Sequence, residues 1–466
     1  MTTQSKPGND LTKGKIFGPL VRLALPIAGV QVMHMAYNLN DMFWLGRLCI
    51  DALAASGIAG LFLWLSVGFM LIGRVGAEVG VSQSRGRGDA GAAYRFSRAA
   101  LCLSAVLGIL YGSFIFFLRE PLIGFFEIQE AHVAADTIAY MAIMAFGIPA
   151  SYIAAAIDGT FVASGNSRTP FLIGGSGLAL NMVLTPVFVF PLQMGVVGAA
   201  VTSVICQYIV LIVRLVAIKR FKSRPFEVYS FRANLSFSNI YTQLRTGEAF
   251  QILKLTWPIC LEHTLFPLLT MVTTRFEVSF GAFAASISRV GTQVESLSWL
   301  VGAGFGAALT AFVGQNFGAG KMERISQSFR YAAFFLTAWG VIVTAIMWFG
   351  GNAIFAVFMP RHVCDLQMRS TFMAHIRILA ASQIFANLEF VASNAFRGRG
   401  QTVPPSVINI ASNVIMVPLA YALSRTTLGL LGIWVARSFT TGLRGVCAFL
   451  CYLRMHSKRS EIAKSP

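Results

Sequence analysis

The stretch Gln83-Ser84-Arg85-Gly86-Arg87-Gly88-Asp89 decides the fold, because its spacing returns 232 residues later as Gln315-Asn316-Phe317-Gly318-Ala319-Gly320-Lys321. Four further patterns repeat in the same order at nearly the same offset. Each match alone is weak, since glycine and proline are common in membrane helices, but five in one order indicate a tandem duplication. The four are Leu25-Pro26-Ile27 with Trp257-Pro258-Ile259, Ala54-Ala55-Ser56 with Ala284-Ala285-Ser286, Asn181 and Pro186 with Asn413 and Pro418, and Gly195-x-x-Gly198 with Gly429-x-x-Gly432.

Each copy consists of apolar segments long enough to cross a bilayer. The chain has 466 residues, of which 56% are hydrophobic and 12% charged, and its mean hydropathy is +0.67. Uncharged runs such as 99–118, 331–360 and 402–424 reach the roughly 20 residues that a membrane-spanning helix needs. We therefore expect an all-α integral membrane protein with about twelve spans, near residues 17–44, 52–82, 95–118, 132–160, 169–190, 195–218, 251–277, 283–314, 327–350, 366–396, 402–424 and 428–453.

The duplication divides these spans into two lobes of six helices. We expect an N-lobe over residues 1–218, an interlobe linker along the cytoplasmic interface over 219–250, and a C-lobe over 251–466. Because each unit has an even number of spans, both units insert in the same orientation, and an axis along the membrane normal relates them. This arrangement predicts a cavity between the lobes.

The net charge of +18 fits membrane topology better than nucleic-acid binding. With the N-terminus inside, most basic residues fall on the cytoplasmic side of the predicted spans, as the positive-inside rule expects. We therefore expect both termini in the cytoplasm and no nucleic-acid partner. The basic residues on that side include Lys13, Lys15, Arg85, Arg87, Arg168, Lys219, Arg220, Lys321, Arg324, Arg397 and Arg399.

The chain carries no pattern typical of an enzyme or a metal site. Its seven cysteines form no CxxC pair and are expected to pack as small apolar residues, and its six histidines have no metal-ligand spacing. GxxxxGK[ST], GxSxG and HExxH are absent from the sequence. We expect no metal, no cofactor and no catalytic residue, so any work that the protein does must draw on an ion gradient.

Several stretches resemble the multidrug and toxic compound extrusion family, and the resemblance covers nearly the whole chain. They are residues 37–47 (YNLNDMFWLGR), Ala52-Leu53-Ala54-Ala55, the two repeated Gln loops, and Gly165-Asn166-Ser167-Arg168-Thr169-Pro170. The resemblance implies a secondary antiporter of a bacterial inner membrane that exports organic, cationic and amphipathic molecules in exchange for H⁺ or Na⁺. An alternative is a lipid-linked precursor flippase of the same superfamily, for which we would expect about fourteen helices and a cationic cavity. We expect a monomer whose partners are a small-molecule substrate and membrane lipids.

Asp41 is the first candidate for ion coupling, because a charged side chain inside the membrane costs about 2.5–3.5 kcal/mol and needs a partner or a task. The alternative is an interfacial residue paired with Arg47. The resemblance implies that Asn181 shares the network of Asp41, and that Thr185 stands where a second Asp often occurs. Thr202 or Ser203 could complete the network from span six. Bending at Pro26 is linked in the family to the state of this aspartate.

The second lobe has its own candidates, Glu262 and Glu389. Glu262, four residues after the second hinge candidate Pro258, looks like the span-seven glutamate of the NorM-like branch, whose span-ten aspartate would fall near Ala386. Glu389 lies one turn beyond and either fills the same space or only bonds to a neighbouring helix. Two further pairs, Glu78 with Arg74 and Glu295 with Arg289, are expected to be structural. Met33, Met35, Phe43 and Phe266 are candidates for adaptable apolar walls of a substrate cavity.

Overall fold

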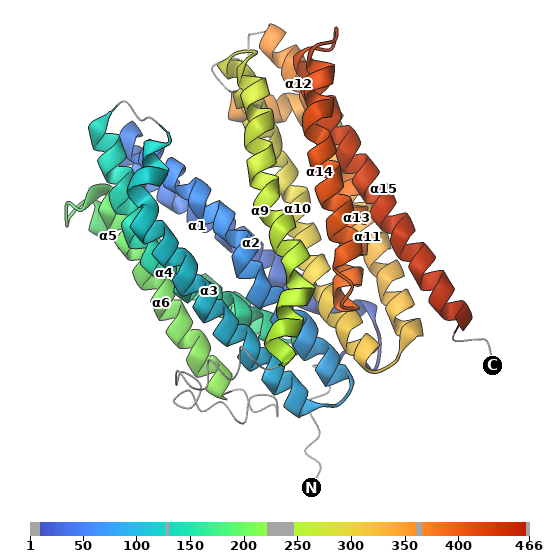
Figure 1. The fold of residues 1–466 in the computed structure, drawn as a ribbon. Helices are drawn as coiled ribbons and strands as arrows, with labels where there is room; N and C mark the ends of the chain where they lie inside the picture. Colours follow the sequence, from blue (N-terminus) through green and yellow to red (C-terminus); the bar gives the residue numbers. More distant parts are fainter. Residues whose placement is uncertain (1–9, 127–129, 221–246, 360–365, 463–466) are drawn as a thin grey trace.

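A computed structural model describes residues 10–126, 130–220, 247–359 and 366–462, and within these ranges the chain is helical without strands (Figure 1). Among the described residues, ten helices are long and apolar enough to cross a membrane. The all-α membrane architecture predicted from the sequence is thereby confirmed. The first lobe contains α1 (Phe17–Leu48), α2 (Ile50–Gly86), α3 (Ala90–Gly124), α4 (Ala131–Ala163), α5 (Arg168–Val189) and α6 (Gly195–Arg220). The second contains α9 (Gly247–Val278), α10 (Ala282–Gly318), α11 (Met322–Phe358), α12 (Leu366–Ala380), α13 (Gln383–Gly398), α14 (Val403–Ser424) and α15 (Leu430–Ile462).

The span predicted over 366–396 is wrong in one respect, because the structure divides it into α12 and α13 with a break at Ala381 and Ser382. A broken helix leaves carbonyl groups that the bilayer cannot solvate. Side chains bond those carbonyls here. Ser438 donates to Ile378 at 2.6 Å, Gln383 to Leu379 at 3.0 Å, and Thr344 to Ala380 at 3.0 Å. Most of the predicted linker, residues 221–246, lies outside the described residues.

The first two helices of each lobe pack against those of the other lobe, α1 against α10 and α2 against α9. The repeated Gln loops meet where the lobes join. Gln83 donates to the carbonyl of Gly398 at 3.0 Å, and Gln315 donates to the carbonyl of Ala163 at 2.8 Å. A Cβ at Gly86 would collide with a main-chain carbonyl of α10. The motif repeats because it supplies both sides of one pseudo-symmetric contact.

We call the end of the molecule where α1 begins and α15 ends the inner end, and the opposite one the outer end. Figure 1 shows the two lobes close together toward the inner end and farther apart toward the outer end. Chain preceding α1 is tied across the lobes, because Lys321 donates to the carbonyl of Thr12 and Arg324 to that of Gly14, both at 2.8 Å. The repeated glycine Gly320 has φ +71°, which lets the chain turn between α10 and α11.

Candidate functional site

Glu262 and Glu389 meet on one amide group in the C-lobe. Asn409 of α14 donates through Nδ2 to Oε1 of Glu262 at 2.8 Å and to Oε1 of Glu389 at 3.0 Å. Glu262 is 9% exposed on α9, and Glu389 is 8% exposed on α13. The structure therefore brings together two carboxyl groups that are 127 positions apart in the sequence.

Other groups of α13 and α14 complete this cluster. Ser406 donates to Oε2 of Glu262 at 2.8 Å, and Ser393 donates to Oε1 of Glu389 at 2.6 Å. Ser406 and Asn409 are three residues apart, whereas Glu389 and Ser393 are four apart, so each pair shares one helix face. Arg397 lies one turn farther along α13, with its guanidinium 3.8 Å from Oε1 of Glu262.

The charges of this cluster leave room for one cation. Two carboxylates against the guanidinium of Arg397 give a net charge of −1 when all are ionised. Oδ1 of Asn409 is buried and has no hydrogen-bond partner among the described residues. Carboxylate and amide oxygens suit a hard cation, and the same oxygens can share a proton. The cluster can thus hold one proton or one monovalent cation between its carboxyl groups.

The contacts of Glu389 fit both of its sequence interpretations. Its carboxyl group accepts from Asn409 of the neighbouring helix α14, and the same amide binds Glu262. A role in place of the displaced span-ten residue stays a prediction. Reasoning from the sequence missed Asn409, Ser406 and Ser393. A signal was available for Asn409, because an asparagine within an apolar span needs a partner.

In the N-lobe, Asp41 of α1 accepts a hydrogen bond from Ser203 of α6 at 3.3 Å. Its other oxygen, Oδ1, is buried and has no hydrogen-bond partner among the described residues. Asn181 of α5 lies in the same region but contacts the neighbours of Asp41. It accepts from Asn40 at 2.9 Å and donates to the hydroxyl of Tyr37 at 2.9 Å. Tyr37 and Asn40 were not identified from the sequence.

The remaining N-lobe candidates are less involved. Thr202 donates to the carbonyl of Gly198 at 2.8 Å, so Ser203 is the one of the two that reaches the aspartate. Thr185 is buried, and its hydroxyl has no partner among the described residues. The pairing of Asp41 with Arg47 does not form, because the Arg47 guanidinium lies 4.4 Å from the centre of the Phe43 ring. Pro26 and Pro258 lie inside α1 and α9, and their role as hinges stays a prediction.

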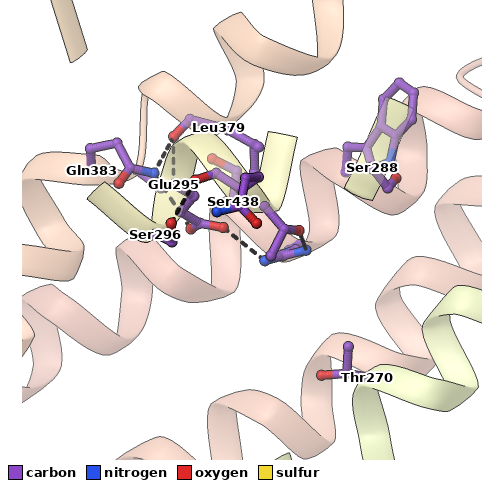
Figure 2. Close-up of polar contacts among 12 residues, drawn as sticks. Thr270, Ser288, Glu295, Ser296, Leu379, Gln383 and Ser438 are labelled. Carbon is purple, nitrogen blue, oxygen red and sulfur yellow. Dashed lines mark hydrogen bonds and ion pairs between the residues drawn. The ribbon is translucent and has the colours of Figure 1, made fainter. Parts of the chain in front are cut away.

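The predicted pairings of Glu295 with Arg289 and of Glu78 with Arg74, each within one helix, are wrong. Glu295 bonds Arg437 of α15 at 2.8 Å, whereas Arg289 is exposed on another face of α10. Figure 2 shows Glu295 beside Gln383 and Leu379 at the break between α12 and α13. Glu78 is buried and forms no ion pair with Arg74 in the described structure, and its Oε1 lacks a hydrogen-bond partner there.

A buried ion pair of the N-lobe was not anticipated. Arg214 of α6 contacts both carboxylate oxygens of Asp158 on α4, at 2.8 and 2.9 Å. The pair fixes α4 against α6, because a planar guanidinium matches a carboxylate in two parallel hydrogen bonds. The two parallel hydrogen bonds make this ion pair stronger and more specific in geometry than a pair joined by one hydrogen bond.

Of the four residues predicted to line a cavity, two lie between the lobes. Phe266 packs between Trp64 of α2 and Trp299 of α10, with ring centres 6.3 and 6.5 Å away. The sulfur of Met35 accepts a hydrogen bond from Gln293 of α10 at 3.7 Å. The other two have neighbours within the N-lobe: Met33 lies next to Gly175 and Phe43 packs on Trp44. Among the described residues, no group of His, Cys, Asp and Glu is arranged to hold a metal ion.

Comparisons with known proteins bear on the family and the fold of the chain. The MatE family model matches residues 26–187 and again 258–422, so each match begins at one of the repeated prolines. The chain is 24% identical over 441 residues to a probable multidrug resistance protein NorM of Thermotoga maritima, covering 93% of this chain and 91% of that protein. It is 23% identical to an FAD transporter of Shewanella oneidensis, covering 95% and 96%.

Solved structures share the fold. A crystal structure of MATE in the bent conformation superimposes with a TM-score of 0.88 at 20% identity and covers 99% of this chain and 100% of that one. The two matched segments of the family model, the repeated motifs and the common fold lead to one conclusion. The chain belongs to the MatE family, the multidrug and toxic compound extrusion proteins that its sequence resembles.

Proposed function

We propose that this protein is a secondary antiporter that exports organic cations in exchange for H⁺ or Na⁺. The observation that carries the proposal is the pair of buried carboxyl groups on Asn409, whose net charge fits one monovalent cation. A cation drives a transport cycle only if it binds two conformations with different affinity. Asn409, Glu262 and Glu389 lie on three different helices, so relative movement of those helices changes the site.

The contact region between the lobes supports an aromatic, cationic substrate. Trp64, Phe266 and Trp299 come from both lobes and offer ring faces and edges. Aromatic rings attract organic cations through the charge distribution of the ring. The names of relatives point the same way, because the Thermotoga protein is called a multidrug resistance protein. The flippase alternative is not favoured by these relatives.

Asp41 is proposed as a coupling group in the N-lobe. Its carboxyl group has one hydrogen bond, from Ser203, and no ion pair in the described structure. A half-buried carboxyl group with one buried, unbonded oxygen is stabilised inside the membrane by a proton or a cation. We place the protein in the inner membrane of a bacterium, with both termini in the cytoplasm, on the distribution of basic residues.

The test is transport of the cationic dye ethidium in everted vesicles, with pH and Na⁺ gradients imposed separately. We expect one of the two gradients to drive uptake in the native protein, and Glu262→Gln and Asp41→Asn to reduce that uptake at least tenfold. The matched control is Glu323→Gln, at an exposed glutamate of α11. Uptake by Asp41→Asn at the native rate would remove the N-lobe site, and dye uptake without either gradient would overturn antiport.

A further inference from the structure

Glu277 is a buried carboxyl group that the coupling sites described above leave unused. It is the second-last residue of α9, near the outer end, and is 6% exposed. Trp434 of α15 donates through its indole nitrogen to Oε1 of Glu277 at 3.1 Å and to the hydroxyl of Ser288 at 2.8 Å. Ser288 and Glu295 lie on the same helix, α10, and both are labelled in Figure 2. The carboxyl group of Glu277 is therefore hydrogen-bonded by neutral groups of two helices, the indole N–H of Trp434 and the hydroxyl of Ser288.

The arrangement resembles that of Asp41 in the other lobe. The last helix repeats at the offset of Gly195 and Gly429, so the position that repeats Ser203 is Arg437, and Trp434 lies about one helical turn before it. The position that repeats Asp41 is Thr273, and Glu277 lies one helical turn beyond it on the same helix. In each lobe, the first helix thus carries a carboxyl group near the outer end, and the last helix donates a hydrogen bond to it.

The charged groups around Glu277 leave it without a counter-ion. Arg437 of α15 is the basic group whose field acts on Glu277, but its guanidinium is bonded to Glu295 of α10 at 2.8 Å. On its own helix, the nearest basic residue, Arg275, is exposed. From α14, Tyr421 packs on the preceding residue of α9, with ring centres 5.7 Å apart, and Arg425 contacts the Tyr421 hydroxyl. An anion buried without a partner is costly, so this group needs a proton or a cation.

A second titratable group lies on the other side of the tryptophan. The ring of His375, from α12, is fully buried, and its centre lies 4.1 Å from the ring of Trp434. Neither ring nitrogen has a hydrogen-bond partner among the described residues. Trp434 therefore lies between the carboxyl group of Glu277 and the imidazole of His375. The positive charge of Arg437, which is paired with Glu295, acts on both groups.

We propose that Glu277, held by Trp434 and Ser288, is a second ionisable site of the C-lobe that takes up and releases a proton from the outer end. Its part in the transport cycle rests on the proposed antiport, whereas its protonation does not. Each lobe then carries one carboxyl site near its outer end, Asp41 or Glu277, at positions about one helical turn apart in the repeat, and the cluster of Glu262 and Glu389 is specific to the C-lobe. The site uses the proton alone, because one carboxyl oxygen, one indole N–H and one hydroxyl do not form a coordination shell for Na⁺.

The experiment is infrared difference spectroscopy of the full-length protein in lipid vesicles, titrated with pH in the absence of substrate. A protonated carboxyl group has a carbonyl stretch that an ionised one lacks. We expect Glu277→Gln to lose one titrating carboxyl band and the exposed control Glu323→Gln to lose none. Trp434→Phe keeps the aromatic contact and removes the donor, so the band is expected to shift to higher frequency.

Two results would overturn the proposal. One is a Glu277→Gln spectrum identical to the native spectrum at every pH, which would mean that the group does not exchange a proton. The other is an unchanged band frequency in Trp434→Phe, which would place the titrating group elsewhere. The spectroscopy uses no substrate and no gradient. Its result therefore decides whether Glu277 exchanges a proton even if the protein does not transport ethidium.

Discussion

The shared amide of Asn409 predicts that Glu262 and Glu389 act as one unit, and a double-mutant cycle tests this. A hydrogen bond to a charged group contributes about 1.5–3 kcal/mol. Glu262→Gln and Glu389→Gln each replace a carboxylate that accepts such a bond at 2.8 or 3.0 Å. Because about 1.4 kcal/mol corresponds to a factor of ten, each variant is expected to lose at least about tenfold in gradient-driven ethidium transport.

The double variant distinguishes one site from two. If one cation is held between both carboxyl groups, the second substitution has little left to remove, and the double variant is about as slow as either single one. The interaction energy between the two substitutions is then nearly as large as the effect of one substitution, about 1.5–3 kcal/mol. Substitutions at independent positions have effects that are additive within about 0.3–0.5 kcal/mol. The control cycle pairs Glu262→Gln with Glu323→Gln, which is exposed on α11. A double variant that loses the product of the two single losses would refute the shared site.

Two other substitutions test contacts outside the coupling sites. Gly86→Val places a side chain where a carbonyl of α10 lies, and such overpacking costs about 1–3 kcal/mol. The control is Gly57→Val, at a position with open space. In detergent, the Gly86→Val protein should unfold at a lower temperature than the control. Asp158→Asn leaves Arg214 buried without its partner, which should cost about 3–5 kcal/mol of stability. Replacing both members of that pair should recover part of the loss, and equal unfolding temperatures for the single and double variants would contradict this account.

The two-lobe fold could be predicted from the sequence because the same motifs occur in the same order in both halves of the chain. The repeated Gln motif lies at the lobe contact, and the repeated Gly-x-x-Gly lies at the start of the last helix of each lobe, so a nearly constant offset implies repeated geometry. The break in span ten could not be predicted, because Ala381 and Ser382 are not helix breakers. The break is stabilised by distant side chains, among them Thr344 and Ser438, which bond the carbonyls that it frees. Tertiary contacts of this kind leave no local signal.

The carboxyl groups of the candidate site could be predicted from the sequence, whereas the residues that bond them could not. Asp41, Glu262 and Glu389 stand out because charge is rare inside apolar spans. Which groups bond them depends on how helices pack, and sequence proximity is misleading there. Glu295 illustrates the point, since its partner is Arg437 on another helix and not Arg289 nearby on its own. Glu277 was overlooked because it lies at the end of a span, where a carboxyl group is ordinary unless it is buried.

The repeated motif supplies part of the energy that keeps the inner end closed. Opening the inner end separates the lobes and breaks the bonds of Gln83 with Gly398 and of Gln315 with Ala163. Both are neutral hydrogen bonds, which contribute about 0.5–1.5 kcal/mol each, so together they favour the closed inner end by about 1–3 kcal/mol. An ion that prefers one conformation a hundredfold supplies about 2.7 kcal/mol. The two Gln bonds are therefore of the same size as the bias from a single ion, and the bonds of Lys321 with Thr12 and of Arg324 with Gly14 add to the contacts that opening the inner end must break.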